Sequence, residues 1–266
     1  MPPPQQDGCI ESVSGNFINA LFHFSKILGF TLAEVLITLG IVGIIASLTI
    51  PSLIDKYKEK EYSTKLKKLY NIMSIAVNNA ILENGTVDEW GLTGSWNNTE
   101  ENQNIIIDKI APYLNIIERC KTASDCNAKK YSTKYLDNSK NGDAIPRILL
   151  NDGSTITSIY IVHSLCKTSR GAGAYLSNVC ATIDFDLNGN KAPNILGIDI
   201  YSFYITKNGF YPKGTKGDQT ETFNNRCLGR TGTQPGQGCT AWVIYNENMD
   251  YLHCNDLSWE GKLKCK

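Results

Sequence analysis

Hydrophobic residues are concentrated near the N-terminus of this chain. Residues 30–50 form a run of 21 amino acids with one ionisable side chain, Glu34. A helix rises about 1.5 Å per residue, so this run is roughly 31 Å long and matches a hydrocarbon core of about 30 Å. The apolar core of a signal peptide is shorter, about 7 to 15 residues, and no small-residue cleavage site follows Ile50. The pattern predicts a membrane-spanning helix over 30–50.

The apolar pattern changes from continuous to periodic after Pro51. Apolar residues then recur at spacings of three and four, which is typical of a helix with one buried face. They are Tyr62, Leu66, Leu69, Met73, Ala76, Val77, Ala80 and Ile81. The pair Asn84 and Gly85 is a typical helix C-terminus. We therefore expect one helix over 30–84, whose amphipathic second half, 51–84, packs against a globular domain.

The rest of the chain, residues 85–266, alternates short apolar runs with turn signals of the Asn-Gly type. A short helix is expected over 99–115. The predicted strands cover 147–150, 155–162, 183–187, 198–206 and 241–245. The pattern predicts an α+β fold, in which an antiparallel sheet covers the second half of the long helix.

Composition and charge exclude only broad classes of protein. With 42% hydrophobic and 20% charged residues, the chain is neither disordered nor collagen-like. The 26 basic and 26 acidic residues cancel, so bulk charge gives no indication of a nucleic acid partner. Six lysines nevertheless follow the apolar run between Lys56 and Lys68. Taken alone, the positive-inside rule would place the C-terminal domain in the cytoplasm.

The cysteines predict the opposite orientation. An even set follows the apolar run and is typical of disulfides formed in an oxidising compartment. Its members are Cys120, Cys126, Cys166, Cys180, Cys227, Cys239, Cys254 and Cys265. A zinc site is disfavoured because no CxxC pair is present. We therefore expect the C-terminal domain to lie outside the cytoplasm.

The pairing of these cysteines is only partly determined by their spacing. Proximity favours sequential pairing of the first four. For the last four, two pairings are open. An expected hairpin over 239–254 would pair Cys239 with Cys254 and Cys227 with Cys265, whereas sequential pairing joins Cys227 to Cys239 and Cys254 to Cys265.

An acidic loop is the second candidate site. Oxygen ligands at positions one, three and five, followed by glycine at six, are typical of the first half of a calcium loop. Position twelve is Ile195 instead of glutamate, so a later acid would have to complete the site. The candidate ligands are Asp184, Asp186, Asn188 and Asp199. The alternative is a tight Asn-Gly turn with solvated carboxylates; calcium is the only cofactor that the sequence suggests.

The residues around Glu34 resemble the processing signature of a known family. The segment Gly29-Phe30-Thr31-Leu32-Ala33-Glu34-Val35-Leu36-Ile37 is similar to the cleavage and methylation motif of type IV prepilins and type II secretion pseudopilins. The resemblance implies that a prepilin peptidase cuts after Gly29 and methylates Phe30. Residues 1–29 would then be a leader, Glu34 the fifth residue of the mature chain, and Pro51 its helix-bending proline.

The same resemblance implies a pilin-like fold and a function in assembly. Cleavage creates an amine at Phe30, which Glu34 of a neighbouring subunit can neutralise, and intramembrane acids are usually functional. The expected partners are other pilin or pseudopilin subunits, prepilin peptidase and membrane lipid. The protein would cross the bacterial cytoplasmic membrane once and then enter a cell-surface or periplasmic filament.

A second function class is a single-span, non-polymerising anchor for a ligand-binding domain outside the cytoplasm. An enzyme is not expected. His163 and Cys166 are spaced as a thiol and a base, but a disulfide-bonded cysteine cannot act as a nucleophile.

Overall fold

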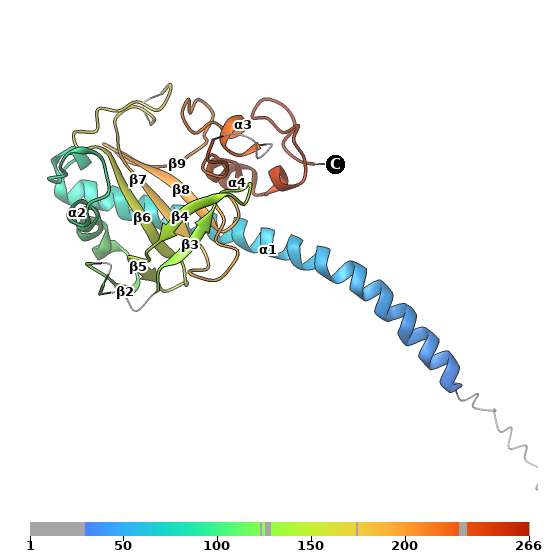
Figure 1. Ribbon diagram of the computed structural model, residues 1–266. Helices are drawn as coiled ribbons and strands as arrows, with labels where there is room; N and C mark the ends of the chain where they lie inside the picture. Colours follow the sequence, from blue (N-terminus) through green and yellow to red (C-terminus); the bar gives the residue numbers. More distant parts are fainter. Residues whose placement is uncertain (1–29, 123, 126–128, 174, 229–232, 266) are drawn as a thin grey trace, which may run out of the picture. The chain divides into compact units, whose positions relative to one another are not determined.

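The structure is a computed structural model and describes residues 30–122, 124–125, 129–173, 175–228 and 233–265 (Figure 1). The predicted leader, including Gly29, lies outside these ranges. The chain divides into two units, Met1–Pro51 and Ser52–Lys266, which are described separately.

Helix α1 runs from Leu32 to Asn84 and contains Pro51. The part of α1 in the first unit has no buried residue among those described. It is the one helix of the described residues that is long and apolar enough to cross a membrane. The sequence prediction of a single continuous helix is confirmed.

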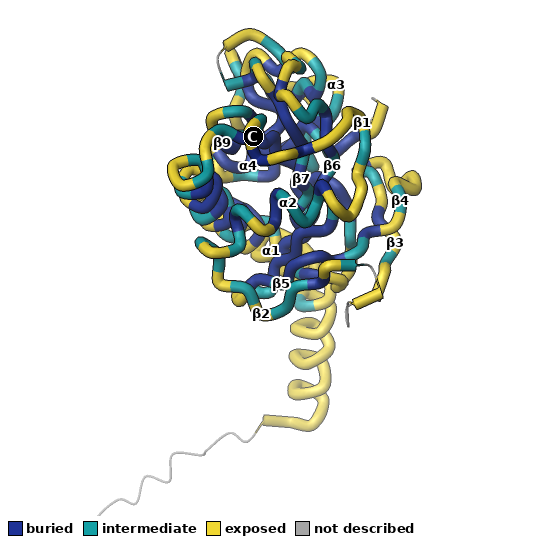
Figure 2. Tube along the Cα trace, turned by 90° about the vertical axis from the view of Figure 1, so that its left-hand side faces the viewer, coloured by how far each residue is buried: buried dark blue, intermediate teal, exposed yellow. Residues whose placement is uncertain are grey.

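In the second unit, α1 buries the face that the periodicity predicts. Its buried residues are Tyr62, Ser63, Leu66, Leu69, Met73, Ala76, Val77 and Ala80. The helix ends at Asn84, and Gly85 adopts a φ of 77°, a left-handed conformation that favours glycine at a helix C-terminus. In Figure 2, the buried turns of this part of the helix and the buried strands are both dark blue.

An antiparallel sheet forms the body of the second unit, in the order β2-β5-β6-β7-β8-β9, with β1 paired to β6 (Figure 1). Its strands are β1 Ser95–Asn97, β2 Ile116–Arg119, β5 Ile148–Leu150, β6 Thr155–His163, β7 Val179–Asp186, β8 Ile200–Thr206 and β9 Gly209–Pro212. Strands β3 (Tyr131–Lys134) and β4 (Lys140–Ala144) form a separate hairpin. The α+β class with an antiparallel sheet is confirmed.

Aromatic side chains join α1 to the sheet. Phe203 of β8 stacks on Phe210 of β9 with ring centroids 4.6 Å apart, and Tyr70 of α1 stacks on both rings at 6.1 Å. Phe185 of β7 meets Phe203 edge to face. Because one face of the sheet and one face of the helix share these rings, they form a single core.

Short helices complete the second unit. Helix α2 (Glu100–Ile110) begins at Thr99, whose side chain accepts a hydrogen bond from the Asn102 amide, and continues into the 3-10 turn η2 (Ala111–Tyr113). This confirms the predicted helix over 99–115. The others are η1 (Val87–Glu89), α3 (Phe223–Arg226), α4 (Thr240–Asn246) and η4 (Asp250–Leu252).

The strand predicted over 241–245 is wrong, because this segment lies within α4. Five consecutive residues from Thr240 to Ile244 are buried, so no polar position reveals the helical period. Trp242 stacks on Phe223 with ring centroids 4.1 Å apart. The side chains are therefore held by aromatic packing at a place where a hairpin was expected.

The disulfides decide between the two pairings of the last four cysteines. Cys227 is bonded to Cys239 and Cys254 to Cys265, so the pairing across a hairpin is wrong. The predicted Cys166–Cys180 bond is confirmed. Cys120 is also disulfide-bonded, and its predicted partner, Cys126, lies outside the described residues.

Candidate functional site

The first turn of α1 places Glu34 in a reciprocal cap. Glu34 Oε2 accepts hydrogen bonds from the Thr31 amide at 2.7 Å and from Thr31 Oγ1 at 2.8 Å. In return, Thr31 Oγ1 accepts a hydrogen bond from the Glu34 amide at 3.2 Å. Threonine followed by glutamate three residues later is the signature of a capping box. Our sequence analysis missed the role of Thr31, although this spacing indicates it.

The cap occupies only part of the Glu34 carboxylate. Both hydrogen bonds to the carboxylate end on Oε2, and among the described residues Oε1 accepts none. Phe30, the residue whose amine cleavage would free, is 87% exposed. The two groups are accessible to another molecule.

The apolar part of α1 exposes large side chains on every side. Leu36, Ile37, Leu39 and Ile44 are each more than 60% exposed, and others follow the same pattern. A contiguous apolar surface of this kind marks a membrane or protein contact. Pro51 lies at the end of this surface, inside the helix.

Three of the four candidate calcium ligands lie together beside β7. The Asn188 amide donates to Asp186 Oδ1 at 3.0 Å, and Asn188 Nδ2 donates to Asp199 Oδ2 at 3.3 Å. Asp199 also accepts hydrogen bonds from the amides of Asn194 and Ile195 at 2.9 and 2.7 Å. Both carboxylates are therefore already bound by donors of the chain itself.

The surroundings of these two carboxylates disfavour their charged forms. Burial raises the pKa of Asp186 to about 7, against the hydrogen bond that Tyr131 Oη donates at 2.7 Å, and the charge of Asp199 adds to the rise. Burial likewise raises the pKa of Asp199 to about 6, although its backbone hydrogen bonds lower it. Each carboxyl group is therefore expected to be partly protonated near neutral pH.

Asp184 points to a different environment. Its Oδ1 accepts a hydrogen bond from Ser202 Oγ at 2.6 Å, across the register that pairs these residues. It lines an open pocket of about 220 Å³ with residues of β3 and β4. Among the described residues, no cluster of three His, Cys, Asp or Glu side chains is arranged to hold a metal. The four candidate ligands are thus not one site here.

The acidic loop is tied to α1 by polar contacts. Asn188 Nδ2 donates to Tyr62 Oη at 3.0 Å. Lys65 Nζ donates to the carbonyl of Asp152 at 2.7 Å and to the carbonyl of Leu187. These contacts fix two loops of the sheet against one turn of the helix.

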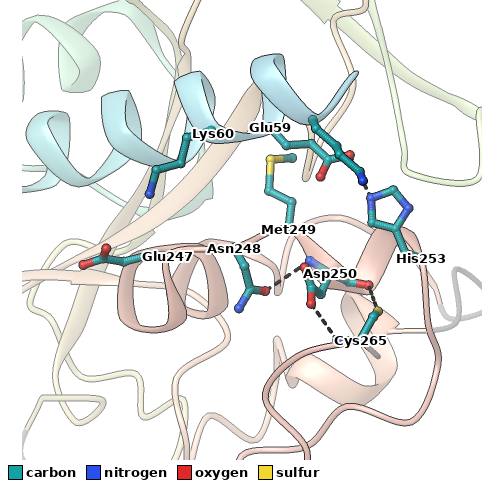
Figure 3. A pocket seen from close by; sticks show the side chains of 9 residues that line it. Glu59, Lys60, Glu247, Asn248, Met249, Asp250, His253 and Cys265 are labelled. Carbon is teal, nitrogen blue, oxygen red and sulfur yellow. Dashed lines mark hydrogen bonds and ion pairs between the residues drawn. The ribbon is translucent and has the colours of Figure 1, made fainter. Parts of the chain in front are cut away.

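An open pocket of about 420 Å³ lies between α1 and the C-terminal segment (Figure 3). His253 Nε2 and Glu59 Oε1 are 2.8 Å apart, and Asp250 Oδ2 accepts a hydrogen bond from the Cys265 amide at 2.6 Å. Cys265 is in a disulfide and cannot act as a nucleophile. The pair of His253 and Glu59 therefore connects the C-terminal segment to α1 at the edge of this pocket.

The thiol and base spacing at 163–166 has a structural explanation. Cys166 is bonded to Cys180, and His163 Nδ1 accepts a hydrogen bond from the Leu165 amide at 3.1 Å. The cysteine is not a free thiol.

Comparison with known proteins gives one result. Residues 52–241 match a family described as a family of unknown function, DUF6613. The chain belongs to the DUF6613 family. The match begins where the second unit begins, so the DUF6613 region contains the docked half of α1 and most of the sheet domain. No characterised protein and no solved structure matches the chain.

Proposed function

We propose that this chain is a prepilin-like subunit, cleaved after Gly29, N-methylated at Phe30 and assembled through α1 into a type IV pilus or a type II secretion pseudopilus. Its partners are other pilin or pseudopilin subunits, prepilin peptidase and membrane lipid. The observation that carries the proposal is the apolar part of α1, which is helical yet buries nothing in its own chain.

An apolar surface on all sides needs apolar surroundings. Lipid tails supply these before assembly, and neighbouring copies of the same helix supply them afterwards. Because both environments are apolar, transfer from one to the other costs little for the aliphatic side chains. The polar groups at the start of the helix then decide whether assembly is favourable.

Glu34 and the amine of Phe30 are those polar groups. An isolated charge in an apolar environment is costly, and an opposite charge offsets that cost. Glu34 Oε2 is engaged by Thr31, whereas Oε1 is available to accept a hydrogen bond from the amine of a neighbouring copy. The proposed pairing therefore does not require the cap to break.

The disulfides support the proposed location of the second unit. Cys166–Cys180, Cys227–Cys239 and Cys254–Cys265 are typical of an oxidising compartment. In the proposed topology, the chain crosses the cytoplasmic membrane once and its sheet domain lies outside the cytoplasm.

The second candidate, an anchored ligand-binding domain that does not polymerise, uses the same helix as a simple anchor. The acidic loop favours it to a limited extent, since Asn188 Oδ1 and Asn194 Oδ1 are buried without a hydrogen-bond partner. This candidate predicts an intact bond between Gly29 and Phe30.

Mass spectrometry of the protein from its native membrane tests the proposal. We expect an N-terminus at N-methylated Phe30. The variant Gly29→Val should retain the leader, whereas Gly40→Val, which changes a glycine with open space around it, should be processed normally. A wild-type chain that still carries Lys26 would contradict the proposal.

A further inference from the structure

We propose that copies of this chain lie side by side and contact one another through α1, with each copy shifted by about 22 Å along the helix axis relative to the next. Two pairs of sites meet in this arrangement. Tyr57 of one copy fills a pocket at Ile72 of the next, while Lys68 of the first faces Glu83 of the second. The inference deepens the proposed function and rests on it only for the parallel orientation of the helices.

The receiving pocket lies at the outer side of α1. It has a volume of about 240 Å³, and its apolar side is formed by Ile72 and Ile75 of α1, Tyr113 and Leu114 at the end of η2, and Leu150 of β5. Asn115, Asn151 and Asp152 form its polar rim. Ile75 is 61% exposed. A mainly apolar pocket with a polar rim is therefore open beside an exposed part of α1.

The donor side chain lies on the same helix, closer to the N-terminus. Tyr57 is 71% exposed and Leu53 is 67% exposed, four residues away and hence on the same side of the helix. Both belong to the second unit. The aromatic ring of Tyr57 is the exposed apolar group suited to a pocket of this size.

Charge complementarity selects a second copy as the occupant. Lys68 is exposed and has no ion pair among the described residues, unlike Lys67, which is paired with Glu247. Glu83 is exposed and has no cationic partner in the described part of the chain. Its carboxylate accepts a hydrogen bond from Tyr113, which lines the pocket, so the charge and the cavity are adjacent.

The spacing along the helix matches on the two sides. Tyr57 and Lys68 are 11 residues apart, and so are Ile72 and Glu83. Eleven residues are about three helical turns, so the members of each pair share a face of the helix. One displacement of 15 residues, about 22 Å at 1.5 Å per residue, therefore brings both pairs together.

Such a contact is head to tail. The surface that donates Tyr57 and Lys68 differs from the surface that receives them, so each copy can use both at once. Contacts of this type propagate into open helical filaments when they do not close into a ring. The inferred contact therefore produces a filament and not a dimer.

Charge reversal and cross-linking test the contact in the full chain in its membrane. Two variants, Tyr57→Cys and Ile75→Cys, are mixed and oxidised, and the cross-linked dimer is quantified. Adding Lys68→Glu to the first or Glu83→Lys to the second should lower the yield about fivefold, as expected for one exposed ion pair. Both reversals together should restore it, and Asp55→Lys, at an exposed position about 160° around the helix from Tyr57, should have no effect.

The outcomes separate this inference from the proposed function. Equal cross-linking between Tyr57→Cys and Lys191→Cys, an exposed position outside the contact, would overturn the inferred contact. So would failure of the double reversal to restore the yield. A specific cross-link in a chain whose N-terminus is uncut would support the contact and contradict the prepilin proposal. Processed protein in filaments without the cross-link would do the opposite.

Discussion

The two halves of helix α1 have the same backbone and opposite relations to the rest of the molecule. Before Pro51 the helix is apolar on every side and buries no residue, whereas after Pro51 one face is fully buried in the core of the sheet domain. A helical backbone is satisfied by its own hydrogen bonds in either environment. The side chains, and not the backbone, therefore determine which environment each half requires. The second half is covered by the sheet domain of its own chain, whereas the first half needs other molecules to cover it.

The strongest test of that comparison is at Glu34, the one ionisable residue of the first half. We expect Glu34→Ala and Glu34→Gln both to abolish filament assembly, because each removes the charge that pairs with the Phe30 amine. Glutamine can still accept the hydrogen bonds from Thr31, so it separates the charge from the cap. Filaments sheared from cells and membrane-bound subunit are quantified by immunoblot.

The matched control at this site is Thr31→Ala, which removes the capping hydroxyl and keeps the charge. It should cost about 1 kcal/mol of local helix stability and leave assembly largely intact. Wild-type filament levels in Glu34→Gln, with loss only in Glu34→Ala, would assign Glu34 to capping alone.

A pair of leucines tests the burial difference directly. Leu66 in the second half is fully buried, whereas Leu36 in the first half is 61% exposed. Leu66→Ala should lower the free energy of unfolding of the sheet domain by about 3 kcal/mol, as for other buried leucines. Leu36→Ala should change it by less than about 0.5 kcal/mol. Denaturant titration of the detergent-solubilised chain, followed by tryptophan fluorescence, measures both; equal losses would contradict the comparison.

Two lysines on the second half of α1 allow a contact that holds the loops on the helix to be compared with an exposed ion pair. Lys65→Met leaves the carbonyls of Asp152 and Leu187 without their donor and should cost about 2 kcal/mol. Lys67→Met breaks an ion pair with Glu247 in which both side chains are about half exposed, and should cost less than about 1 kcal/mol. The same titration compares the two variants, and the reverse order would show that Lys65 does not hold the loops on the helix.

The smallest expected effect is a pH dependence from the acidic loop. The folded-state pKa of Asp186 is raised to about 7, above its unfolded value, so the folded state binds more protons between these values. The stability contributed by this group is complete below the unfolded pKa and is lost as pH rises through about 7. We expect Asp186→Asn to reduce the difference in unfolding free energy between pH 6.5 and pH 8 by about 0.8 kcal/mol.

The control for this measurement is Asp184→Asn, which removes a carboxylate from the same strand where it is only half-buried. It should leave the difference between the two pH values as in the wild type. A larger effect at Asp184 than at Asp186 would mean that burial beside Tyr131 does not control protonation in the loop.

Local patterns predicted much of the fold. The run over 30–50, the periodicity after Pro51 and the Asn84-Gly85 stop together placed α1 correctly. Four predicted strands overlap β5, β6, β7 and β8, because each alternates or forms an apolar run next to a turn signal. The short strands β1 to β4 and β9 were not predicted, since each has only three to five residues and, unlike β5, no run of three apolar residues.

The candidate sites were predicted less completely. Glu34 stands out from the sequence because it is charged in an apolar run, but its cap with Thr31 required the spacing to be interpreted as a helix start. The acidic motif identified Asp184, Asp186 and Asn188, yet only Asn188 is hydrogen-bonded to Asp199, and Asp186 is linked to it through Asn188. Asp184 is instead bonded to Ser202 of the neighbouring strand, a partner that strand register selects.

The amino-acid sequence was sufficient wherever the controlling interaction is local. Local features depend on residues within a few positions of one another, so they can be predicted from the sequence alone. They include the helical period, capping, turns and the length of an apolar run. Contacts between distant segments needed the tertiary structure. The choice of Cys227–Cys239 over the hairpin pairing, the helical form of the buried segment 240–246 and the raised pKa of Asp186 all arise from groups brought together only by folding.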